Sequence, residues 1–165
     1  MELTKRQAAI LYIAYSYGVG IALTSFMKLC YFFDLMAMAN RNAKITDFEY
    51  IRYSYGPFDS KIYSDIENLI FQGSLRTKSY SVGQEENILY QFNDINEDSF
   101  NPSRYFSTEE IGEMNQVLEE FKGFGAKTLT AAAYKTAPMI ALNATLGGSE
   151  NLGKRLNLEL VINQR

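Results

Sequence analysis

The side chains in this sequence that could do chemistry as a group are carboxylates. Glu109 and Glu113 lie four residues apart, a spacing that places both on one helix face, where they could pair as acid and base. Asp94, Glu97 and Asp98 could supply oxygen ligands to a divalent cation. Catalytic carboxylates need burial or a convergent partner to shift their pKa, whereas these two groups fall on an acidic helix face and in a polar loop. A metal-dependent enzyme that uses carboxylates alone is therefore the least favoured function.

The residue types that are missing exclude most other enzyme chemistry. The chain has no histidine, no tryptophan and one cysteine, Cys30. Without imidazole it cannot form a histidine-based triad or an ordinary zinc site, and a single cysteine cannot form an intrachain disulfide. The sequence also lacks a phosphate-binding loop, a nucleophile elbow and a dinucleotide-binding motif. We predict a protein that is not an enzyme and has no metal or cofactor, in a reducing cytoplasm.

Length and charge indicate one globular domain with no general attraction to nucleic acid. The 165 residues are 47% hydrophobic, and 16 Lys and Arg stand against 19 Asp and Glu, a formal charge of -3. Ten acids and one base fall within residues 85–120, which we interpret as solvated surface; the alternative is a segment that docks a basic partner. The uncharged stretch between Arg6 and Lys28 is divided by Gly18 and Gly20, so it predicts two buried helices and no membrane span.

Capping motifs predict where the helices lie. Thr4 with Gln7, and Ser107 with Glu110, have the spacing of capping boxes and mark two helix starts. Glycines or proline end most of the helices because they favour left-handed caps or break the helix. The expected helices run from Thr4 to about Gly18, from Thr24 or Ser25 to about Asn40, from Asp59 or Ser60 to Gly73, from Ser107 to Gly123, and over 128–135.

Four further segments predict strands. Aromatic and β-branched residues over 48–55 indicate a strand that enters the turn over 55–58, and residues 75–81 and 88–93 flank a short polar loop and predict a hairpin. Residues 156–163 alternate between apolar and polar side chains, the pattern of a strand with one buried face. This terminal strand would complete the hairpin sheet or pair with a second copy in a homodimer.

These elements predict an α+β fold, a mostly helical single domain with a small antiparallel sheet. Two helices followed by a helix and a hairpin is also the winged-helix order, so a DNA-binding transcriptional regulator is the alternative function. Its reading helix would offer Lys61 against Asp59, Asp65 and Glu67, which is a poor match to phosphate. The charge pattern therefore disfavours nucleic acid as a partner.

Tyrosines around the Gly56-Pro57 turn could form a protein-binding surface. Tyrosine presents apolar area at little entropic cost and tolerates water at its hydroxyl, which suits an interface anchor. Alternation along a strand places Tyr50 and Arg52 on one face and Tyr53 and Tyr55 on the other, so at most one set faces the core. The alternative is that the turn needs special backbone angles and that the tyrosines are half-buried core.

The most specific pattern joins this turn to the second helix. The helix carries the motif Lys-Leu-Cys-Tyr-Phe at positions 28–32 and Asp34, and the motif Tyr-Gly-Pro follows at positions 55–57, before a helix that ends at Gly73. This arrangement resembles the Panacea domain, also called the SocA-like antitoxin domain and often described as phage-associated, over about half of the chain. A late helical motif of that family contains histidine and tryptophan; both are absent from 129–139 here, where Tyr134 takes the place of the histidine.

The resemblance implies an antitoxin module that neutralises a toxin encoded by a neighbouring gene through direct protein contact. It also implies that one domain spans 1–165, with 140–165 as a divergent C-terminal extension, because that segment has no counterpart in the family pattern. Its motifs and the tyrosine surface together give the candidate partner-binding residues, which are Lys28, Tyr31, Asp34, Arg52, Tyr53, Tyr55, Gly56, Pro57 and Tyr134.

Overall fold

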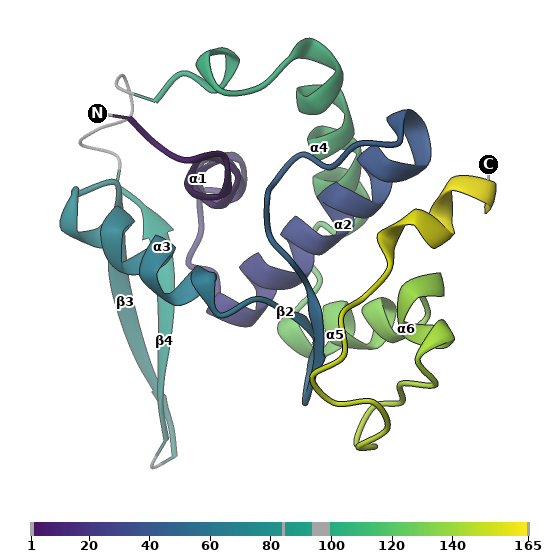
Figure 1. The fold of residues 1–165 in the computed structure, drawn as a ribbon. Coiled ribbons are helices and arrows are strands. Elements are labelled where there is room, and N and C mark those ends of the chain that lie inside the picture. Colours follow the sequence, from purple (N-terminus) through teal and green to yellow (C-terminus); the bar gives the residue numbers. More distant parts are fainter. Residues whose placement is uncertain (1, 84, 94–99, 165) are drawn as a thin grey trace.

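The structure is a computed structural model that describes residues 2–83, 85–93 and 100–164 (Figure 1). It is α+β and mostly helical, as predicted, with two small antiparallel sheets of two strands each. The elements are α1 (Lys5–Tyr17), α2 (Leu23–Arg41), β1 (Ile51–Tyr53), β2 (Gly56–Phe58), α3 (Lys61–Phe71), β3 (Leu75–Val82), β4 (Glu85–Phe92), η2 (Pro102–Arg104), α4 (Thr108–Glu120), α5 (Ala126–Tyr134), α6 (Ala137–Ala141) and η3 (Leu158–Gln164).

Helix α2 forms the centre of the fold. Most of its residues are buried because α1, α4, α5, β2 and η3 pack around it (Figure 1).

The predicted capping boxes at Thr4 and Ser107 are both present, and Gly18 ends α1 in the left-handed conformation. The start of α2 differs from the prediction: its cap is Ala22, which has no side-chain hydrogen bond. No helix in the described part of the chain combines the length and apolar character needed to cross a bilayer.

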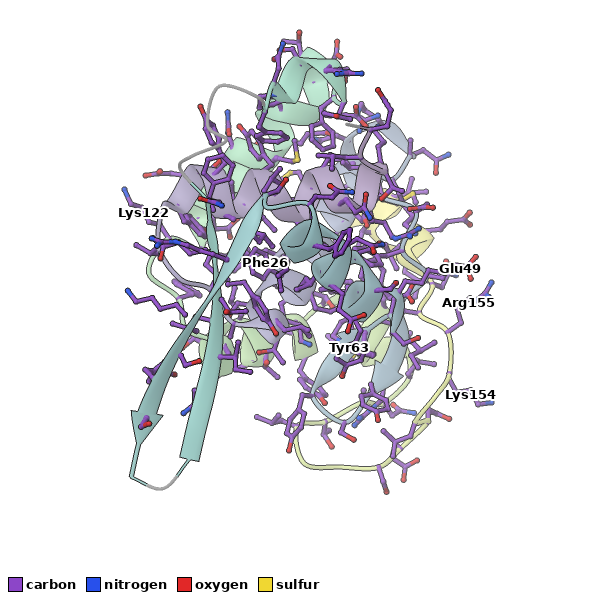
Figure 2. All side chains as sticks on the ribbon, turned by 90° about the vertical axis from the view of Figure 1, so that its left-hand side faces the viewer. Phe26, Glu49, Tyr63, Lys122, Lys154 and Arg155 are labelled. Atoms are coloured by element: carbon purple, nitrogen blue, oxygen red, sulfur yellow. The ribbon has the colours of Figure 1, made fainter. Side chains whose placement is uncertain are left out.

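The two hairpins differ in length and setting. Strands β3 and β4 pair along their whole length, confirming the predicted hairpin, and Figure 1 shows them extending away from the helices. Strand β1 is shorter than the predicted 48–55, because the chain turns at Ser54 and Tyr55 and Gly56 already pairs opposite Tyr53 in β2. Figure 2 places Tyr63 of α3 on the outer surface, on the face turned toward the viewer.

The predicted terminal strand over 156–163 is wrong. Residues Leu158–Gln164 form the 3-10 helix η3, and the β-pairing of this region is limited to an isolated bridge between Ile51 and Arg155. The buried residues are Leu156, Leu158 and Val161, so the spacing lengthens from two to three residues where the chain coils against α2 and α6. A homodimer through a C-terminal strand therefore has no strand to form it.

Candidate protein-binding site

Lys28 lies beneath the β1–β2 turn and holds it from below. Its Nζ donates a hydrogen bond to the Pro57 carbonyl at 3.1 Å, and the side chain is only 2% exposed. Gly56 has φ +105°, which side chains rarely adopt, and a Cβ there would stand 3.1 Å from the Lys28 Cε. Burial lowers the pKa of Lys28 to about 8. Lys28 therefore contacts the turn from inside the protein and is not exposed to a partner.

Arg52 is fully buried behind β1, so it is not available to a partner. Its Nη1 donates to the Tyr53 carbonyl at 2.6 Å, and its Nη2 donates to the carbonyls of Thr145 and Gly148 at 3.0 and 2.9 Å. Its guanidinium carbon lies 5.5 Å from the ring centroid of Tyr134. Arg52 thus ties the turn to a loop about ninety residues further along the chain.

Tyr134 also supports the turn from below, whereas Tyr31 lies in the core. The Tyr134 hydroxyl donates to the Ser54 carbonyl at 3.2 Å, and its ring lies beside both Gly56 and Arg52. The Tyr31 hydroxyl lies 2.7 Å from Thr136 Oγ1, and burial raises the pKa of Tyr31 above the ordinary value for tyrosine. Both side chains are buried, but only Tyr134 contacts the turn; the Tyr31 ring packs edge-on against Tyr50, with 5.2 Å between ring centroids.

Asp34 belongs to a separate buried network. Its carboxylate accepts hydrogen bonds from the Ile45 and Thr46 amides, the Thr46 hydroxyl and the Tyr50 hydroxyl, at 2.6–2.8 Å. Burial raises the pKa of Asp34, while these hydrogen bonds act in the opposite direction. With its side chain fully buried, Asp34 fixes the segment that leads into β1.

Tyr53 and Tyr55 are the exposed members of the predicted set. They are 50% and 67% exposed, whereas Tyr50 and Arg52 are buried, which is the division that strand alternation indicated, although Tyr55 itself lies in the turn after β1. Tyr53 stacks on Phe58, with 5.2 Å between ring centroids, and Phe58 lies 5.6 Å from the ring centroid of Tyr63. Tyr53 of β1, Phe58 of β2 and Tyr63 of α3 therefore form a continuous aromatic row. Together with the exposed Tyr55 of the adjoining turn they make up what we call the tip surface: Tyr53, Tyr55, Phe58 and Tyr63.

A pocket of about 400 Å³ adjoins Tyr55 and is not evident in the sequence. We call it the tip pocket; it is lined by Thr24, Tyr55, Ala126, Lys127, Thr130 and Leu146. Sequence reasoning selected Tyr55 but missed the other lining residues, because they come from α2, α5 and a late loop. A helix-period pattern in 126–134 could have placed Lys127 and Thr130 near one another, but no local signal brings Leu146 to this site.

The structure places one of the carboxylates singled out in the sequence differently from the prediction. Glu113, predicted to lie on an outer face, is buried and accepts a hydrogen bond from Arg41 Nη2 at 2.8 Å. Asp94, Glu97 and Asp98 lie outside the described residues. Within residues 2–83, 85–93 and 100–164, no three His, Cys, Asp or Glu side chains lie close enough together to hold a metal ion.

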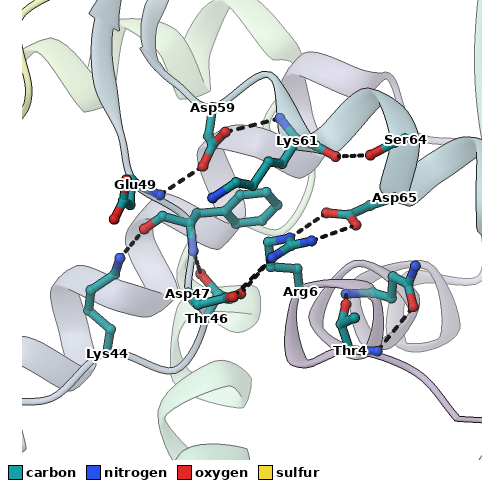
Figure 3. A network of polar contacts seen from close by, with 12 residues as sticks. Thr4, Arg6, Lys44, Thr46, Asp47, Glu49, Asp59, Lys61, Ser64 and Asp65 are labelled. Carbon is teal, nitrogen blue, oxygen red and sulfur yellow. Dashed lines mark hydrogen bonds and ion pairs between the residues drawn. The ribbon is translucent and has the colours of Figure 1, made fainter.

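A second polar network surrounds Arg6 of α1 (Figure 3). Its guanidinium contacts Asp65 of α3 through Nε at 2.8 Å and Asp47 through Nη1 at 2.9 Å, while Asp59 accepts from the Glu49 amide at 2.8 Å. These bonds join α1, α3 and the segment before β1. The network consequently fixes the frame on which the tip surface stands.

Comparison with known proteins identifies the family. The family model described as antitoxin SocA-like, Panacea domain, matches residues 26–138, which is more than half of the chain and includes α2, the tip surface and α5. No curated protein and no solved structure matches the chain. On the strength of that match, and of the lysine-supported Gly-Pro turn that lies within it, the chain belongs to the SocA-like antitoxin family with a Panacea domain.

Proposed function

We propose that this protein neutralises a partner toxin by direct, non-catalytic contact through the tip surface. The single observation that carries the proposal is the contrast at β1: Tyr53 and Tyr55 are exposed, whereas Arg52 and Pro57 behind them are buried and hydrogen-bonded. An exposed aromatic row on a fixed support can bind with little loss of conformational entropy. The family supports an antitoxin role, and the tip surface supplies a place for the toxin to bind.

The buried support distinguishes this surface from scattered exposed aromatics. Lys28, Arg52 and Tyr134 each bond to a backbone carbonyl of residues 53–57, so the turn is held at three points. Interface hot spots are rigid aromatic side chains that already have their bound conformation. We infer that the toxin packs an apolar patch against Tyr53 and Tyr55, and that this contact covers its working site.

The DNA-binding alternative gains no support from α3. Arg6, the base nearest to that helix, is neutralised by Asp65 and Asp47 (Figure 3). Helix α3 itself contains one base, Lys61, and two acids, Asp65 and Glu67. Because phosphate binding requires several bases on one face, a winged-helix-like order of elements does not by itself make this a DNA-binding protein.

Growth rescue followed by affinity measurement tests the proposal. Each gene adjacent to the one that encodes this chain is expressed alone in bacteria, and a product that arrests growth is co-expressed with the chain. We expect rescue by the wild type, and calorimetry with the two purified proteins should give a complex. Tyr55→Ala and Tyr53→Ala should each weaken affinity by roughly tenfold or more, the effect of losing an aromatic anchor.

Tyr80→Ala is the matched control, because Tyr80 is 44% exposed but lies on β3, away from the tip surface. It should bind and rescue like the wild type. Circular dichroism must show that all three variants are folded. Full rescue and unchanged affinity in a folded Tyr53→Ala/Tyr55→Ala double variant would refute the proposal.

A further inference from the structure

The tip pocket is a preformed hollow with mainly apolar walls. Tyr55 and Leu146, which line it, are 67% and 59% exposed, and Thr24, Ala126, Lys127 and Thr130 form the rest of the lining. Its volume of about 400 Å³ falls within the roughly 300–1,000 Å³ typical of binding pockets. A pocket of this kind can receive a large apolar side chain that is presented by another protein.

Arg52 positions one wall of this pocket. Its Nη2 bonds to the carbonyls of Thr145 and Gly148, on the two sides of Leu146, so the loop that carries Leu146 is bound to a fully buried residue. Leu146 lies beyond residue 138, where the family match ends. Arg52 is therefore a positioning residue, and through Leu146 the later segment contributes to a site that lies mostly within the matched domain.

The surroundings of the tip pocket are positively charged, although the whole chain is not. Lys127 lines the pocket, and the lining includes no carboxylate. Among the described residues, neither Lys28 nor Arg52 forms an ion pair: both bond to backbone carbonyls. Helices α2 and α5 begin beside the pocket without a side-chain cap or an acidic residue in the first turn, which leaves their partial positive charges uncompensated. This local charge contrasts with the formal -3 of the chain.

We propose that the tip pocket binds an apolar side chain of the partner protein that is flanked by acidic residues. The apolar side chain would occupy the pocket between Tyr55 and Leu146, and the flanking carboxylates would pair with Lys127 and the nearby helix starts. This inference rests on the proposed function, because it names the part of the toxin that the tip surface receives. Nucleic acid would also be attracted by positive charge, but the apolar walls and the single lysine of the lining favour a protein segment.

A titration followed by nuclear magnetic resonance tests the charge preference without a toxin. The probes are two short capped peptides, each with a central phenylalanine, flanked on both sides by two aspartates in one and by two lysines in the other. We expect the acidic peptide to shift the signals of Thr24, Lys127 and Leu146 and to bind roughly fivefold more tightly than the basic peptide. Lys127→Glu should remove or reverse that preference. Equal binding of both peptides, or shifts elsewhere only, would overturn the proposal.

Two leucines of the same segment give a matched pair. Leu146→Asp places a charge in the pocket wall and should abolish binding of the acidic peptide, whereas Leu152→Asp, at a site that is 48% exposed and outside the pocket, should not. As a single substitution, Arg52→Lys should weaken binding of the acidic peptide. In a protein that already carries Leu146→Ala, it should not weaken that binding further. An equal loss in both backgrounds would contradict the positioning role.

The two proposals can fail separately. If no neighbouring product arrests growth but the acidic peptide binds as expected, the antitoxin function fails and the pocket assignment stands. If a toxin is neutralised while Lys127→Glu and Leu146→Asp rescue fully and the peptides do not bind, the tip pocket assignment is refuted and the tip surface remains.

Discussion

Replacing Lys28 with methionine would test whether burying the charge of Lys28 lowers the stability of the folded protein. The lysine is nearly inaccessible, and burial lowers its pKa from 10.5 to about 8. The unfolded chain therefore binds this proton more tightly than the folded chain, so protonation favours unfolding. The loss of folding stability is present in full below about pH 8, and it disappears as the pH rises toward 10.5.

The magnitude follows from the two pKa values. The difference between 10.5 and about 8 corresponds to roughly 3 kcal/mol of lost stability at neutral pH, most of which is recovered by pH 10. Methionine has a similar length and no charge, so Lys28→Met removes this pH dependence. It also removes the hydrogen bond to the Pro57 carbonyl, at a cost of about 1 kcal/mol that does not change with pH.

Urea unfolding at several pH values between 7 and 10 measures the effect. Burial also raises the pKa values of Cys30, Tyr31 and Tyr50, so these groups lower the stability of both proteins in alkali, and their contributions cancel in the difference. We expect the wild type to gain about 2–3 kcal/mol relative to Lys28→Met over this range. Lys61→Met, at an exposed position, should follow the wild-type curve. Parallel curves for the wild type and Lys28→Met would refute the reasoning.

Three other changes test separate parts of the structure. Gly56→Ala should destabilise the fold by about 1–3 kcal/mol in urea unfolding, because alanine strains at φ +105° and meets the Lys28 side chain; wild-type stability would contradict this. Asp34→Asn should cost roughly 2–3 kcal/mol, because an amide cannot accept all four hydrogen bonds that reach this carboxylate; an unchanged unfolding midpoint would exclude that role. Truncation after residue 141 should lower the thermal midpoint by at least about 10 °C or prevent folding, because it exposes Arg52 and removes Leu156 and Val161 from the core; an unchanged midpoint would show that residues 142–165 are dispensable.

The features that sequence predicted well depend on neighbours in the chain. The capping boxes at Thr4 and Ser107 and the long hairpin each involve side chains or turns only a few residues apart. Strand alternation correctly separated Arg52 from Tyr53. It could not decide which face was inside, because the groups that bind Arg52 lie at Thr145 and Gly148.

The errors arose where distant packing overrode a local pattern. Alternation over 156–163 indicated a strand, yet only residue 155 forms a bridge to β1, and the rest coils into η3 against α2. The sequence predicted Glu113 on an acidic, exposed helix face, but in the structure it is buried and forms an ion pair with Arg41 at the end of α2. Neither partner could be identified from spacing, because the pairing depends on how α2 and α4 pack.

The three buried charges around β1 share one feature that explains how they support a binding surface. Lys28, Arg52 and Asp34 all bond to backbone groups: Arg52 and Asp34 to loop segments, and Lys28 to the Pro57 carbonyl in the three-residue strand β2. Backbone groups outside regular structure need partners when they are buried, and charged side chains make the strongest hydrogen bonds available to them. The desolvation cost of each charge is thereby offset by hydrogen bonds that fix a loop or a short strand which little regular structure holds. The segments that are fixed in this way carry Tyr53, Tyr55 and Leu146. The protein therefore orders its docking side chains when it folds, and these side chains lose less conformational entropy when a partner binds.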